Sequence, residues 1–115
     1  MNDRERIDLL RGIQELAGRD EGQLKALLPF LDEACVAAGT VLAQEGRLCH
    51  QLVIVATGEL EECRRGRPVN RGRGAAFGWK AMRERGKCDA TVRALSPAHL
   101  LLMSHEQFRA AEAVA

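Results

Sequence analysis

The first thirty residues carry apolar side chains at helical spacing. Asp3 precedes the first apolar series as an expected N-cap, and Gly18 is expected to end it. A second series of leucines follows the segment Asp20-Glu-Gly-Gln23, which has the pattern of a capping box, and Pro29 disfavours continuation of that helix. The pattern therefore predicts helices within about residues 4–28. The apolar positions are Ile7, Leu10, Ile13 and Leu16, then Leu24, Leu27 and Leu28.

After about residue 35 the pattern changes to short runs rich in β-branched residues. Gly39, Gly46 and Gly58 each separate two such runs, and glycine permits the positive φ of a tight turn. Short strands at this close spacing are typical of a sandwich or barrel over about residues 35–103. The predicted strands are 35–38, 41–44, 51–56, 59–65, a short return strand from Val69, 90–95 and 99–103.

Two further helices are predicted beside these strands. A short one is expected near residues 79–83, and Ser104-His-Glu-Gln107 has the pattern of a capping box that opens a last helix over about residues 105–113. With no internal repeat and no linker to a second unit, residues 1–115 are interpreted as one domain of ordinary size.

Composition narrows the function classes. Apolar residues make up 46% of the 115 residues, aromatic residues only 3%, and the net charge of +1 selects neither nucleic acid nor membrane as a partner. No apolar run approaches the ~20 residues of a membrane span, and the charged N-terminus is not a signal peptide, so a cytoplasmic protein is expected. The four cysteines lack metal-ligand spacing, so no metal site is predicted.

The order of runs and glycines, together with Phe77-Gly78, Ala81-Met82 and Ala90-Thr-Val92, resembles the cyclic nucleotide-binding domain family. The resemblance covers roughly residues 24–108. It implies a mainly β fold, a double-stranded β-helix (jelly roll) flanked by short α-helices. It also implies a phosphate-binding cassette, in which backbone N–H groups and an arginine hold the cyclic phosphate and a glutamate accepts a hydrogen bond from the ribose hydroxyl.

Two cassette positions depart from that family pattern. Trp79 stands where glutamate is expected, and Cys88 stands where arginine is expected. Asp89 adds a negative charge beside the phosphate position. The cassette is therefore interpreted as degenerate, and ordinary binding of cyclic AMP or cyclic GMP is expected to be lost. The candidate ligand-binding residues are Phe77, Gly78, Trp79, Lys80, Ala81, Met82, Arg83, Arg85, Cys88, Asp89, Ala90 and Thr91.

Alternatives remain open at this cassette. The candidates to replace the missing arginine are Arg83, Arg85 and Lys87 in its loop and Arg71 and Arg73 before it. Trp79 is expected either to stack on a base or to pack against the roll. Glu62 shares a strand face with the apolar Leu60, so it either points into the roll, where it needs a charged partner, or is turned outward by a bulge.

The sequence favours a non-catalytic regulatory or protein-interaction module that acts in signalling, with a protein partner or a second copy. The alternative is a sensor that binds a cyclic nucleotide or another anionic ligand through the cassette arginines and Trp79.

An enzyme is not expected, because His50, His99 and His105 are isolated and no nucleophile elbow or P-loop is present. Direct DNA binding is not expected either, because no helix-turn-helix follows the roll. Five arginines between residues 64 and 73 indicate either an acidic partner or a plain charged hairpin.

Overall fold

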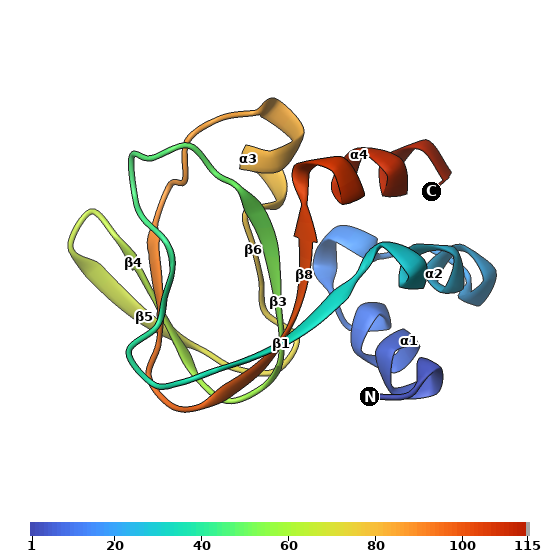
Figure 1. The fold of residues 1–115 in the computed structure, drawn as a ribbon, viewed down its shortest axis with the longest axis horizontal. Helices are drawn as coiled ribbons and strands as arrows, with labels where there is room; N and C mark the ends of the chain where they lie inside the picture. The colour runs from blue at the N-terminus through green and yellow to red at the C-terminus, as the bar shows by residue number, and fades with distance from the viewer. Residues whose placement is uncertain (115) are drawn as a thin grey trace.

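The computed structural model describes residues 1–114 and confirms a mainly β fold with short helices at its margins (Figure 1). The helices are α1 (Asp3–Arg11), α2 (Glu21–Leu27), α3 (Trp79–Glu84) and α4 (His105–Val114), with 3₁₀ turns η1 (Gln14–Leu16) and η2 (Leu28–Phe30). The strands are β1 (Asp32–Val36), β2 (Val41–Ala43), β3 (Gln51–Thr57), β4 (Leu60–Arg64), β5 (Arg67–Arg71), β6 (Ala76–Phe77), β7 (Thr91–Ala94) and β8 (Ala98–Ser104).

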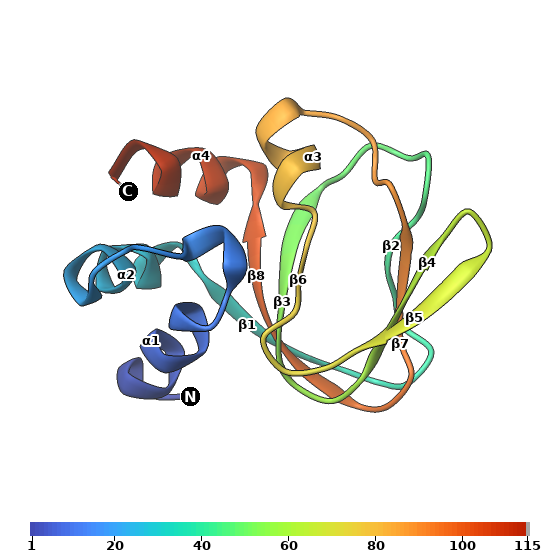
Figure 2. The same ribbon diagram turned by 180° about the vertical axis from the view of Figure 1, so that it is seen from behind.

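The strands form two four-stranded antiparallel sheets, ordered β1-β8-β3-β6 and β2-β7-β4-β5. Helices α1, α2 and α4 lie on the side of the first sheet that faces away from the second (Figures 1 and 2). The first sheet is therefore covered on both faces. Leu52 and Ile54 of β3 join a core with the helices, whereas Val53 and Val55 join a core with the second sheet. This double coverage explains why β3 is a continuous apolar run and does not alternate with polar residues.

Several predicted boundaries of the helices are wrong by a few residues. Asn2, and not Asp3, caps α1, because its side-chain oxygen accepts from the Glu5 N–H at 2.8 Å. Helix α1 ends at Arg11 with Gly12 as its C-cap, well before Gly18. The capping box that opens α2 is confirmed, with reciprocal bonds of 2.8 and 2.9 Å between Asp20 and Gln23.

The first strand begins at Asp32, three residues earlier than predicted. Pro29 ends α2 in a 3₁₀ turn, and the chain is already extended at Leu31. Asp32 then pairs with Leu102 of β8, so the pairing of the strands begins before the apolar run does. The apolar pattern did not indicate this start, because residues 32 and 33 are charged and their side chains face solvent and ion-pair partners.

A cluster of charges at Glu33 ties α1 to the first sheet. The Glu33 carboxylate accepts from the Arg6 guanidinium, with Nε at 3.0 Å, and lies 3.3 Å from the N-terminal amine and 3.1 Å from His99 Nε2. The hydrogen bond from Arg6, helped by the N-terminus and His99, lowers the pKa of Glu33 to about 2.

This cluster predicts a pH dependence of stability. A carboxyl group whose pKa is lowered by folding stabilises the folded state above its unfolded pKa, and this contribution disappears as the pH falls towards the folded pKa. We expect the melting temperature to fall more steeply between about pH 5 and pH 2 in the unaltered chain than in Glu33→Gln. Thermal denaturation followed by circular dichroism measures both slopes. Equal slopes would show that Glu33 is not coupled to folding.

Strands β4 and β5 form a hairpin that projects from the roll at the end opposite α1, α2 and α4 (Figure 2). All five residues of β5 are exposed, and β5 is the edge of its sheet. Among residues 1–114, no helix is both long enough and apolar enough to span a membrane.

Candidate functional site

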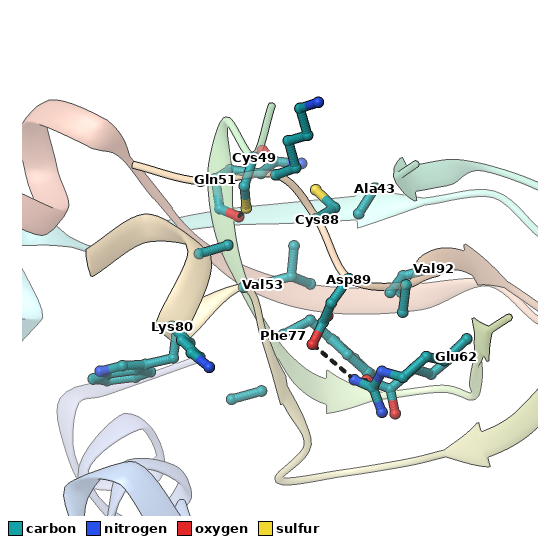
Figure 3. A pocket seen from close by; sticks show the side chains of 18 of the residues that line it. Ala43, Cys49, Gln51, Val53, Glu62, Phe77, Lys80, Cys88, Asp89 and Val92 are labelled. Carbon is teal, nitrogen blue, oxygen red and sulfur yellow. Dashed lines mark hydrogen bonds and ion pairs between the residues drawn. The ribbon is translucent and has the colours of Figure 1, made fainter. Parts of the chain in front are cut away.

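A cavity of about 340 Å³ opens between the two sheets, with α3 and the loop that follows it forming one wall (Figure 3). Its apolar part comes from strands of both sheets, and its rim is charged. The lining residues are Glu15, Ala43, Cys49, Gln51, Val53, Glu62, Arg64, Ala76, Phe77, Gly78, Trp79, Lys80, Ala81, Glu84, Gly86, Lys87, Cys88, Asp89, Ala90 and Val92.

Gly78 brings the start of α3 against β3. It has a φ of 90°, and a Cβ at this position would lie 3.0 Å from the Gln51 carbonyl oxygen and 3.1 Å from Cys49 Sγ. Only glycine meets both the left-handed conformation and the tight contact without strain. The Phe77-Gly78 pair therefore positions the wall of the cavity, with the Phe77 ring buried between the sheets.

Most of the predicted cassette lies on the cavity wall. The lining residues among the twelve candidates are Phe77, Gly78, Trp79, Lys80, Ala81, Cys88, Asp89 and Ala90.

The other four candidates do not line the cavity. Met82 is buried in the helical core, and Arg83 pairs with Glu112 of α4 at 3.3 Å. Arg85 has a φ of 53° and follows α3, and the Thr91 hydroxyl accepts from the Glu45 N–H at 3.1 Å.

Glu62 points towards the cavity and is neutralised by arginines. Its side chain is only 12% exposed, and its carboxylate lies 3.2 Å from Arg71 and 3.4 Å from Arg64. The alternative of an outward bulge is wrong, because β4 keeps one continuous register with both β5 and β7 through this position. The ion pairs supply the charged partners that a carboxylate in this position requires.

Arg64 joins two acidic residues of the cavity lining. Its Nη2 lies 3.4 Å from Glu62 and 3.2 Å from Asp89, the contact marked by the dashed line in Figure 3. Asp89 is 76% exposed and follows Cys88, so this ion pair bridges the second sheet to the loop after α3. The guanidinium that lines the cavity is thus already engaged by two carboxylates.

Trp79 packs against the helical core. Its ring meets the Phe108 ring of α4 edge to face, with centroids 5.9 Å apart and planes at 82°. Its indole Nε1 is buried and has no hydrogen-bond partner within the described part of the chain. This geometry favours the packed alternative for Trp79 over a ring that is free to stack on a bound base.

Cys49 and Cys88 lie together on the same wall. Their segments are joined by backbone hydrogen bonds, from the Cys49 N–H to Gly86 at 3.0 Å and from the Cys88 N–H to Arg47 at 2.7 Å. Burial, together with the neighbouring Cys88 thiol, raises the pKa of the Cys49 thiol to about 11. Cys49 therefore remains a neutral thiol near pH 7, and neither cysteine supplies the positive charge of the family's arginine.

Sequence reasoning missed Arg64 as a lining residue. The period of two along the strand could have identified it, because Arg64 follows Leu60 and Glu62 at intervals of two residues and lies on the same strand face. Glu15 in η1 had no such signal, because η1 approaches the cavity only in the folded chain.

The comparisons place this geometry in a known family. The family model described as "Cyclic nucleotide-binding domain" matches residues 34–113. No curated protein sequence matches the chain significantly.

Solved structures share the fold across nearly the whole chain. The regulatory domain of Toxoplasma gondii PKA with cAMP is 27% identical, with a TM-score of 0.83 over 94% of this chain and 43% of that one. The N-terminal domain of a Streptomyces coelicolor A3(2) transcriptional regulator is 26% identical, with a TM-score of 0.80 over 93% of this chain and 78% of that one. A cyclic nucleotide-binding-like protein from Brucella abortus is 20% identical, with a TM-score of 0.80 over 95% and 98%.

The chain spans 39% and 43% of the length of two PKA regulatory chains that it matches. The family match nevertheless covers more than half of this chain and includes both sheets, α3 and nearly all of α4. The protein therefore belongs to the cyclic nucleotide-binding domain family.

Proposed function

We propose that this domain is a non-catalytic regulatory or protein-interaction module that has lost ordinary binding of cyclic AMP and cyclic GMP. The proposal rests on the position of Arg64 in the cavity and on its ion pairs. Among residues 1–114 it is the only arginine that lines the cavity, and its guanidinium is engaged by Glu62 and Asp89. A cyclic phosphate that approached Arg64 would meet the negative charge of both carboxylates beside it.

The charge of the cavity supports the same conclusion. Four carboxylates line it, from Glu15, Glu62, Glu84 and Asp89, against three cations, from Arg64, Lys80 and Lys87. Cys88 stands at the position where the family pattern has arginine. An arginine–phosphate hydrogen bond is worth about 1.5–3 kcal/mol, so its loss corresponds to roughly one to two decades in affinity.

The alternative function, a sensor that uses the cassette arginines and Trp79, has less support. Arg83 is paired with Glu112, and neither Arg83 nor Arg85 lines the cavity. The Trp79 ring packs on Phe108. Binding of an anion through these residues would require Arg83 to leave its partner and the loop after α3 to move.

Calorimetry on the purified chain tests the proposal. We expect no saturable heat with cyclic AMP or cyclic GMP up to about 1 mM. A dissociation constant of 1 mM corresponds to a binding free energy of about −4 kcal/mol. Micromolar binding would contradict the proposal. If Arg83→Ala or Arg85→Ala then abolished that binding, the sensor alternative would replace it, with circular dichroism confirming that each variant is folded.

A further inference from the structure

The inner face of the β4–β5 hairpin continues the cavity wall outward. Paired residues on antiparallel strands share a face, so Val69 lies on the same face as Glu62, and Arg67 on the same face as Arg64. A groove of about 480 Å³ runs along this face and shares Glu62 and Arg64 with the cavity. We call this surface the basic hairpin face; it is lined by Glu62, Arg64, Arg65, Arg67, Val69 and Arg71.

Two of its arginines stand directly opposite each other. Arg64 pairs with Arg67 in the register of the hairpin, and both lie on the inner face. Like charges at directly opposed positions destabilise a strand pair. The hairpin therefore carries a charge arrangement that its own folding does not favour, and an anion between the two guanidiniums would relieve it.

A third arginine occupies a disfavoured turn position. Arg65 has a φ of 52° and Gly66 a φ of 76°, as in a two-residue hairpin turn with both central residues left-handed. Such turns favour Asn-Gly or Asp-Gly, and a residue with a long side chain at the first position is conformationally costly. Departures from local preference that add charge to one exposed surface are typical of binding sites.

The charge of this face is only partly compensated within the chain. Glu62 is shared by Arg64 and Arg71, and Arg64 also meets Asp89. In residues 1–114 the side chains of Arg65 and Arg67 form no ion pair or hydrogen bond. Two guanidiniums are thus available to an acidic partner without breaking an internal contact.

The surface favours a peptide over a nucleic acid. The hairpin contains no aromatic residue on which a base could stack, whereas Val69 presents an apolar side chain, 49% exposed, between Arg67 and Arg71. Pro68 lacks an N–H, which weakens the free edge of β5 for strand addition, so the contact is expected through side chains on the face.

We propose that the basic hairpin face binds an extended acidic segment of a partner protein, with carboxylates two residues on either side of an apolar residue. Arg67, Val69 and Arg71 project from one strand face at intervals of two residues, about 6.6 Å apart, and an extended peptide repeats at the same interval. One carboxylate would meet Arg67, whose side chain forms no ion pair within residues 1–114. The other would meet Arg71 beside its 3.2 Å contact with Glu62, and the apolar side chain would cover Val69. This proposal names the partner chemistry of the interaction module proposed above.

Fluorescence anisotropy with a labelled peptide tests this inference on the full chain. The probe is Gly-Ser-Glu-Ser-Leu-Ser-Glu-Ser-Gly, and a peptide with both glutamates changed to lysine is its control. We expect saturable binding of the first peptide only, weakened at least about tenfold by Arg67→Glu and several-fold by Val69→Ser. The matched control Arg47→Glu reverses an exposed arginine outside the face and should leave binding unchanged.

Each outcome has one meaning. Absence of peptide binding, or equal weakening by Arg67→Glu and Arg47→Glu, would overturn the inference. Tighter binding of a single-stranded oligonucleotide than of the acidic peptide would overturn it in favour of nucleic acid. The calorimetry with cyclic nucleotides is a separate measurement, so failure of the peptide inference and failure of the proposed function are distinguishable.

Discussion

A chain that carries Cys88→Arg and Asp89→Ala should bind cyclic AMP roughly 10- to 100-fold more tightly than the unaltered chain. The first change supplies a guanidinium at the predicted cassette position that now holds a cysteine. The second removes a carboxylate from the rim and releases Arg64 from its 3.2 Å contact. One charge-assisted hydrogen bond of about 1.5–3 kcal/mol accounts for the whole of the expected gain. Calorimetry under the conditions used for the unaltered chain should then show saturable heat where the unaltered chain shows none, which sets a lower limit to the gain.

Trp79 is left unchanged in this design for a structural reason. Its ring packs on Phe108 and helps to join α3 to the helical core, and removal of a packed tryptophan typically costs about 3–5 kcal/mol. A glutamate there would confound a test of binding with a loss of stability. The matched control is Cys35→Arg, which adds the same charge at an exposed cysteine on β1. A folded double variant with no gain in affinity would show that residue 88 does not reach the phosphate.

Gly58→Ala should remove much of the stability of the fold. Gly58 has a φ of 96° in the turn between β3 and β4, and a Cβ there would lie 2.6 Å from the Pro97 carbonyl oxygen and 2.8 Å from Ala98 Cα. The atoms that it would meet belong to Pro97 in the β7–β8 turn and to Ala98 at the start of β8, so relief requires the two segments to separate. We expect a loss of about 3 kcal/mol or more, a large part of the ~5–15 kcal/mol of a small domain.

Gly39→Ala is the matched control for this effect. Gly39 also has a positive φ, 89°, but an added Cβ would meet no atom within 4 Å. It carries the conformational cost of about 1 kcal/mol without the steric overlap. Urea denaturation of both variants separates the two terms. Equal losses would show that the turns adjust to the added methyl group.

Local patterns predicted those elements whose stability depends on neighbours in sequence. The capping box of α2 and the end of that helix before Pro29 were both recognisable, because a cap and a proline act within one turn of a helix. The start of β1 was not, because Asp32 is placed in a strand by its partner Leu102, which is far away in sequence. The N-cap at Asn2 was also missed, since Asp3 has the same capping chemistry.

The sequence by itself determined the fold family, because β-branched runs, glycine turns and the Phe77-Gly78 pair are local features. It also indicated the strand face that carries Glu62, through the period of two. Only the tertiary structure decided the partners of these residues. Three contacts join different elements: Glu62 with Arg71, Arg64 with Asp89, and Trp79 with Phe108. Their geometry follows from the packing of the two sheets and the helices.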